Sequence, residues 1–256
     1  FIDDIAELIT SKYIFTPKTK DELQKAVDLW CDLENRDSIK ITKEKYGDIS
    51  NWDTSFITDM SKLFYCKFFF NDDISNWDVS NVTNMKKMFH GASDFNQDLN
   101  NWNVSNVTNM RHMFTSSTKF DQNINNWNVS NVTDMSYMFN DCETFNQPLD
   151  NWNVSNVRYM SSMFEGAEKF NQNINNWNVS NVIHMGLMFK DAIQFNQPLN
   201  NWNLLNLDEM PAMFYYAIAF NQPLDKWDVS KVTNMKGLFQ GATSFKQSLD
   251  NWDVSS

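Results

Sequence analysis

Histidine and cysteine offer the most direct route to nucleophilic, acid–base or metal chemistry in this chain, and both are scarce. The histidines are His90, His112 and His184, and the cysteines are Cys31, Cys66 and Cys142. The histidines occupy different positions of a repeated unit and lie in different units, so they form neither a triad nor a metal set. The cysteines are odd in number and far apart, which gives no disulfide framework and no zinc spacing. We expect them to be small core residues.

Other catalytic signatures are also missing from the sequence. It contains no glycine-rich loop that would cradle a phosphate and no glycine-flanked serine elbow. Acidic side chains are plentiful, but they are scattered over positions expected to face solvent. The sequence therefore predicts a protein that is not an enzyme, with no catalytic, metal-binding or cofactor-binding residues and no cofactor.

Two regularly spaced residue types offer binding chemistry instead. Trp recurs every 25 residues from Trp52 to Trp252, and an exposed ladder of indoles would stack on sugar rings. The tryptophans alternate with valine, however, which favours the core. Asn or Asp recurs in columns that begin at Asn51, Asp53 and Asn81, and stacked amides usually bond to one another and to backbone at turns. Calcium is the rival interpretation, but five of the nine residues in the column from Asp53 are neutral Asn.

These residues belong to a strict 25-residue period, which must decide the fold. Two Met columns and two Phe columns share the spacing of the Trp column, and a typical unit is Asn126–Asp150, NWNVSNVTDMSYMFNDCETFNQPLD. No insertion breaks the register, so residues 51–250 comprise eight identical coils followed by a partial ninth. Each coil would cover the open apolar face of its neighbour.

The two halves of a unit differ in apolar spacing. Alternation in Trp127-Asn128-Val129 predicts a very short strand. Apolar residues at three- and four-residue steps then predict a helix of about two turns; they are Val132, Met135, Met138, Phe139 and Cys142. We therefore expect an α/β repeat solenoid with one short parallel strand and one short helix per coil, the alternative being a parallel β-helix-like solenoid.

The unit resembles the 25- to 26-residue BspA-type repeat of bacterial surface lipoproteins, which also occurs in large DNA viruses. The resemblance rests on the motif NWNVSNVTNMxxMFxGAxxFNQPL and covers residues 51–256. It implies a right-handed, leucine-rich-repeat-like solenoid, a role in adhesion or partner binding, and a place on a cell surface, a virion or a virus-infected cell. It supplies no catalytic residues.

The two ends of the chain depart from the repeat. Residues 1–50 are predicted to be a helical N-terminal cap, since Thr19-Lys20-Asp21-Glu22 reads as a capping box before the apolar stripe of Leu23, Ala26, Val27 and Trp30. Extra aromatics at Phe56, Phe68 and Phe69 are expected to pack against that helix. The opening stretch lacks the basic region of a signal peptide, and the chain is expected to end in an uncapped strand.

Charge and exposed apolar residues indicate the kind of partner. A formal charge of −11 argues against non-specific binding to nucleic acid, and no apolar run is long enough to span a bilayer. Positions that are polar elsewhere become apolar near the end of the array, in a region that also contains Pro211. Such a cluster indicates an interaction site, the alternative being neutral drift or unusual local packing of the helix around Pro211. The candidate partner-binding residues are Tyr159, Ile183, Leu187, Ile193, Leu205, Tyr215, Tyr216 and Ile218. The sequence thus predicts a protein–protein interaction or structural module that binds another protein, a copy of itself or a neighbouring domain. A carbohydrate-binding surface adhesin is the alternative.

Overall fold

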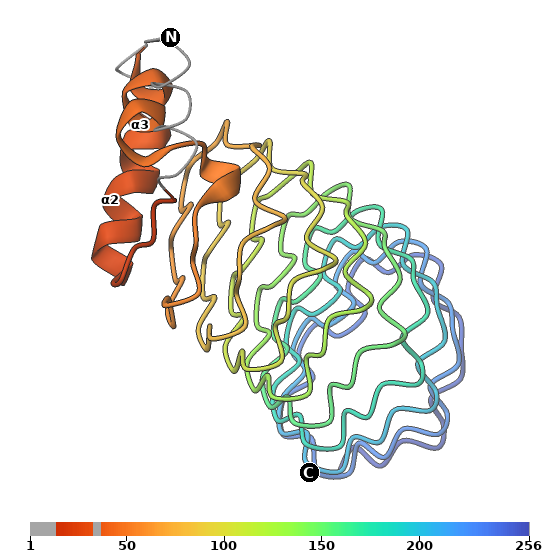
Figure 1. The fold of residues 1–256 in the computed structure, drawn as a ribbon. Coiled ribbons are helices and arrows are strands. Elements are labelled where there is room, and N and C mark those ends of the chain that lie inside the picture. Colours follow the sequence, from red (N-terminus) through yellow and green to blue (C-terminus); the bar gives the residue numbers. More distant parts are fainter. Residues whose placement is uncertain (1–13, 33–36, 256) are drawn as a thin grey trace, which may run out of the picture.

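A computed structural model describes residues 14–32 and 37–255. Its helices are α2 (Lys20–Trp30), α3 (Ser38–Tyr46) and the short 3-10 helix η1 (Ile49–Asn51). Figure 1 shows α2 and α3 at one end of a stack of coils that twists along its length. Three predictions fall partly outside the described residues. They are the cap at residues 1–50, the opening stretch and the end at Ser256.

Helix α2 begins and packs as its sequence predicts. The Thr19 side chain accepts a hydrogen bond from the Glu22 backbone N–H at 3.2 Å, which satisfies one of the free N–H groups of the first turn. The buried residues of α2 are Leu23, Ala26, Val27 and Trp30. The Trp30 indole meets the Trp52 indole edge to face, with centroids 5.9 Å apart, so α2 covers the first face of the stack.

Backbone hydrogen bonds join each coil to the next through one stretch of the unit. In the coil of residues 126–150, the N–H groups of Met135, Tyr137, Phe139 and Asp141 all donate to carbonyls 24 residues ahead, over 2.7–3.0 Å. Isolated parallel bridges follow the same stretch, for example between Asp134 and Tyr159. We call residues 133–144, with the equivalent residues of the other units, the bridged side.

The helix predicted for each unit is wrong. The N–H groups of Met138, Asn140 and Cys142 donate to carbonyls three residues back, not four, and the residues between them bond to the next coil. Tyr137 and Asp141 have φ values of 61° and 55°, which an α-helix does not admit. Successive three-residue turns place apolar residues inward at the same three- and four-residue steps as a helix. The apolar spacing that predicted a helix is therefore produced by turns.

The strand predicted at Trp127-Asn128-Val129 is also wrong. Within residues 14–32 and 37–255 the ladder consists of isolated bridges on the bridged side, and no extended strand is present. Around the tryptophans, side chains link the coils instead: the Trp127 indole N–H donates to the Leu99 carbonyl at 2.9 Å, and the Asn156 amide donates to the Ser130 carbonyl at 2.7 Å. The leucine-rich-repeat-like α/β solenoid is therefore overturned, and its β-helix-like alternative, which also requires strands, is not found.

The core consists of residue columns that repeat every 25 residues. Phe139 is fully buried and stacks on Phe114 and Phe164, with centroids 5.8 and 5.7 Å apart. The tryptophans from Trp52 to Trp227 are at most 4% exposed. These columns place the apolar side chains inside, as predicted, and leave the indoles no open face for a sugar.

Amide columns join the coils at their polar turns. The Asn171 carboxamide oxygen accepts from the Asn196 backbone N–H at 2.9 Å and from the Gln197 side chain at 3.1 Å. The Asp53 carboxylate instead accepts from the Ser55 backbone N–H two residues on. The Ser55 hydroxyl and this local turn bond lower the pKa of Asp53. These oxygens thus serve as hydrogen-bond acceptors within and between the coils. The described residues contain no group of three or more His, Cys, Asp or Glu side chains that could hold a metal ion.

Candidate interaction surface

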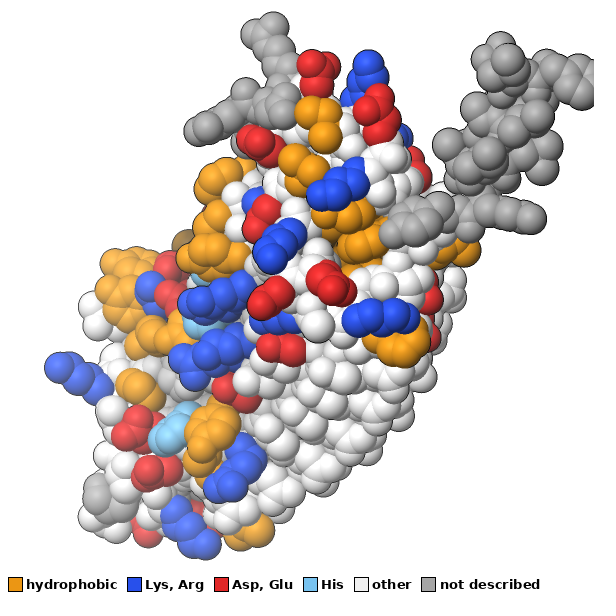
Figure 2. All heavy atoms as spheres, turned by 60° about the vertical axis from the view of Figure 1, so that its left-hand side comes forward, with side chains coloured by type: hydrophobic (Ala, Val, Ile, Leu, Met, Phe, Trp, Pro, Cys, Tyr) orange, Lys and Arg blue, Asp and Glu red, His pale blue; other side chains and the backbone are white. Residues whose placement is uncertain are grey.

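Side chains that differ from unit to unit lie mainly on the bridged side. At the position of Tyr137, for example, the other units carry Lys, His, Ser, Leu, Ala or Gly, whereas the Trp and Asn columns hardly change. Figure 2 shows charged and hydrophobic side chains gathered along one side of the stack, next to a surface with almost none of either. The bridged side is therefore where individual units acquire individual chemistry.

The candidate partner-binding residues fall on this side, with one exception. Tyr159, Tyr216 and Ile218 are 37%, 46% and 45% exposed. The partly buried members are Ile183, Leu187, Ile193 and Tyr215. Leu205 is 53% exposed, but it lies beside the Trp column, where its N–H is held by the Asn203 side chain. The structure thus separates Leu205 from the other candidates.

Four of the candidates form one group, which we call the C-terminal apolar zone: Ile193, Tyr215, Tyr216 and Ile218. The rings of Tyr215 and Tyr216 meet edge to face at 4.6 Å. Ile193 and Ile218 occupy the same position in adjacent coils, where the Ala219 N–H donates to the Ile193 carbonyl at 3.2 Å. Tyr159 lies earlier in the stack, with its ring on that of His184 at 5.8 Å.

Pro211 fits the bridged side for a local reason. In the second coil, the equivalent residue Lys86 donates its N–H to the Asn84 side chain, a bond found in several coils. Pro211 has no N–H and Glu209 replaces the asparagine, so nothing is left unsatisfied. The Pro211 carbonyl still accepts from the Leu187 N–H at 2.9 Å. Proline at this position is thus compatible with a turn, whereas it would disrupt the interior of an α-helix.

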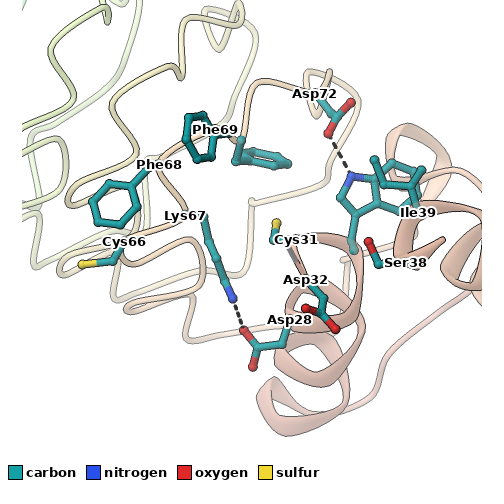
Figure 3. A pocket seen from close by; sticks show the side chains of 12 residues that line it. Asp28, Cys31, Asp32, Ser38, Ile39, Cys66, Lys67, Phe68, Phe69 and Asp72 are labelled. Atoms are coloured by element: carbon teal, nitrogen blue, oxygen red, sulfur yellow. Dashed lines mark hydrogen bonds and ion pairs between the residues drawn. The ribbon is translucent and has the colours of Figure 1, made fainter. Parts of the chain in front are cut away.

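Sequence reasoning missed a pocket between α2 and the first coil. It encloses about 500 Å³ and contains both Cys31 and Cys66. Figure 3 shows Lys67 reaching from the coil to Asp28 of α2, an ion pair of 2.7 Å. Burial raises the pKa of the Cys31 thiol to about 12.

The extra aromatics of the first coil were expected to pack against the cap helix; Phe68 and Phe69 line the pocket beside α2 but remain largely exposed. Phe68 and Phe69 are 49% and 67% exposed at the mouth of the pocket, and Phe56 is 56% exposed beneath the Lys18 ammonium. Phe68 occupies the same position of its unit as Ile218. The bridged side therefore begins, as well as ends, with exposed apolar residues.

Two of the histidines, expected to be unrelated, lie in one aromatic row along the bridged side. The row runs Tyr65, His90, His112, Tyr137, with successive ring centroids 5.0, 5.8 and 4.3 Å apart. Burial, then the positive charges of Lys87 and Arg111, lower the pKa of His112 to about 4. His112 is thus neutral near pH 7, and its ring contributes an aromatic surface and no charge.

The middle of the bridged side is acidic. Asp141, Glu143 and Glu168 are exposed, and Glu165 pairs with Lys190 at 2.8 Å. The pKa of Asp141 is raised, first by burial and then by the charge of Glu165. Burial of the Asp141 carboxyl is the larger cause, and repulsion from the neighbouring carboxylate adds to it.

Together the stacked coils and their amide columns define a repeat protein that is made of near-identical 25-residue units. The family described as "Mycoplasma protein of unknown function, DUF285" matches residues 35–152 and again residues 133–252. The chain belongs to this family. No curated protein matches it, and no helix within the described residues is both long and apolar enough to cross a bilayer.

Proposed function

We propose that this chain is a non-enzymatic protein–protein interaction or structural module that presents its bridged side to another protein. The observation that carries the proposal is the C-terminal apolar zone, where Tyr216 and Ile218 are 46% and 45% exposed on the side that varies between units. Aromatic and branched aliphatic side chains clustered on a surface mark binding sites because water exclusion there stabilises a complex.

The likeness of the unit to BspA-type repeats supports the same role. Those repeats are associated with adhesion and partner binding, and we propose that this chain is of that type. A carbohydrate-binding role would use the indole column or the Asn columns, and the indole column has no observation in its favour. Trp127 is 2% exposed and its indole N–H is bound to a backbone carbonyl.

A capture experiment with matched variants tests the proposal. The immobilised chain is exposed to proteins from its native cellular or extracellular setting, and bound proteins are identified by mass spectrometry and re-tested in purified form. Tyr216→Glu combined with Ile218→Glu should abolish binding without changing the melting temperature. Thr118→Glu, at the position of Ile218 in another unit, should retain it.

Either of two results would contradict the proposal. Binding that survives the double substitution would show that the C-terminal apolar zone is not the contact surface. Absence of any protein partner for the wild-type chain, a second copy of the chain included, would reject the interaction module altogether.

A further inference from the structure

The bridged side carries four zones in a fixed order along the stack. The first, the N-terminal apolar zone, lies in the first coil and consists of Tyr65, Phe68 and Phe69, which are all exposed. A basic zone follows in the second and third coils: Lys86, Lys87 and Arg111. An acidic zone lies in the fourth and fifth coils: Asp141, Glu143, Glu165 and Glu168, with Arg158 and Lys169 at the two margins of the bridged side in the fifth coil. The C-terminal apolar zone closes the series in the sixth and seventh coils.

The charges at the centre of this series are largely unneutralised within the chain. Arg111 pairs with Asp134 at 3.7 Å and Glu165 with Lys190. Among described residues, Lys86 and Lys87 have no ion-pair partner, and neither do Asp141, Glu143 and Glu168. Opposite charges in adjacent coils of one face are thus available to an external surface.

The order apolar, basic, acidic, apolar is complementary to itself when reversed. If two bridged sides meet with their stacks antiparallel, each apolar zone faces the other apolar zone, and each basic zone faces an acidic zone. A parallel arrangement in register would instead oppose like charges. A two-fold axis between the third and fourth coils generates the antiparallel arrangement. It sets the second coil against the fifth and the third against the fourth, and it uses the same surface on both copies.

We propose that the bridged side is the interface of an antiparallel dimer, whose partner is a second copy of this chain. Hydrogen-bonded coils about 4.8 Å apart place the first and seventh coils roughly 29 Å apart, a suitable length for an interface of about 800 Å² per partner. The stack twists (Figure 1), so the two stacks cross at an angle, as packed twisted sheets do at about 30°.

An acidic peptide is a weaker occupant for the same surface. It would neutralise Lys86, Lys87 and Arg111, but it would leave both apolar zones exposed and would be repelled by the acidic zone. Only a partner with the same four zones in reverse order covers all of them. This inference rests on the proposed function, because it names the partner of the same surface.

Charge reversal tests the pairing. One variant combines Lys62→Glu, Lys86→Glu and Lys87→Glu, since Lys62 is an exposed neighbour of the basic zone. The other combines Asp141→Lys, Glu143→Lys and Glu168→Lys. In sedimentation equilibrium at low salt and up to about 1 mM protein, the wild type should be dimeric and each variant alone monomeric. An equimolar mixture of the two variants should dimerise, because every charged zone again meets its opposite.

Salt and cross-linking test the geometry. Raising the ionic strength from about 0.01 to about 1 M shortens the Debye length from about 30 to about 3 Å and should shift the wild type toward monomer. Asn140 lies in the fourth coil, directly beside the two-fold axis, so the axis brings it close to its own copy. With Cys66→Ser as background, Asn140→Cys should form an intermolecular disulfide, and Ser130→Cys, in the same unit but beside the Trp column, should not.

A wild type that stays monomeric at low salt, or a variant mixture that does not associate, would overturn the dimer. Efficient cross-linking through Ser130→Cys and not through Asn140→Cys would do the same. If capture of a different protein still depends on Tyr216 and Ile218 in that case, the proposed function stands and only this inference fails.

Discussion

Replacing Ala212 by glycine should stabilise the protein, although both residues are small and nothing is added. Ala212 has a φ of 51°, in the left-handed region. Its N–H donates to the Lys236 carbonyl at 2.9 Å, so the neighbouring coil holds this backbone conformation in place. Gly237 occupies the same position in the next unit, with a φ of 69°.

The magnitude follows from two opposing terms. An L-residue in the left-handed region costs about 1–2 kcal/mol, which glycine avoids. Glycine loses additional chain entropy on folding, about 0.5–1 kcal/mol relative to alanine. Ala212 is partly exposed, so its methyl group contributes little burial. The net gain should be about 0.5–1 kcal/mol, whereas in a helix the same substitution would cost about 1 kcal/mol.

Urea unfolding followed by tryptophan fluorescence would measure the change as a higher midpoint at constant slope. Ala217→Gly is the control in the same unit, since Ala217 is fully buried and is not among the residues with positive φ. It should lose about 1 kcal/mol or more, through chain entropy and the missing methyl group. If Ala212→Gly destabilises the chain as much as Ala217→Gly does, the turn-based account of the bridged side is refuted.

Three further outcomes are expected. Phe139→Ala should lower the free energy of unfolding in urea by about 3–5 kcal/mol. Phe239→Ala should lower it by about half as much, because Phe239 is partly exposed and stacks on a neighbouring coil on one side only. Equal losses would contradict the stacking argument. The pKa of His112 is lowered to about 4 from an ordinary 6.5, so the unfolded chain takes up the proton first. Stability should therefore fall as the pH drops from 6.5 toward 4, and less steeply in His112→Gln; an unchanged slope would refute the assignment. Burial raises the pKa of the Cys142 thiol, so iodoacetamide at pH 8 should modify Cys66 in the folded chain and reach Cys142 only after unfolding; equal rates in the folded chain would contradict this.

The repeat period and the core could be read from the sequence because both depend on which side chains are apolar. Trp127, Met135 and Phe139 are buried at the positions where their columns predicted core. The start of α2 was also predictable, since the Thr19 cap and the apolar stripe behind it are local signals. In each case a residue type at a fixed spacing determines the result.

The backbone of the coil could not be read in the same way. Its distinguishing feature is the direction of alternate N–H groups, toward the next coil or toward a carbonyl three residues back, and side-chain spacing carries no record of that choice. The residues at positive φ give little warning either, because Tyr137, Leu187 and Lys87 stand where glycine would be expected. Only Gly91, Gly166, Gly237 and Gly241 signal these turns in the array.

The candidate interaction surface was only partly predictable, because it depends on which units are neighbours across the coil boundary. The apolar departures around Tyr216 could be found by comparing each unit with the consensus, and the first coil shows the same departure at Phe68 and Phe69. The row of His90 and His112 was not evident, since the two histidines hold different positions of the unit and meet only because adjacent coils lie in hydrogen-bonded contact. In a stacked repeat, a site is therefore formed by residues from several adjacent coils. Their sequence separation is the 25-residue period, increased or decreased by a few residues. A search for chemistry in such sequences should compare residues 22 to 28 apart, the separations over which inter-coil bonds are found in this chain.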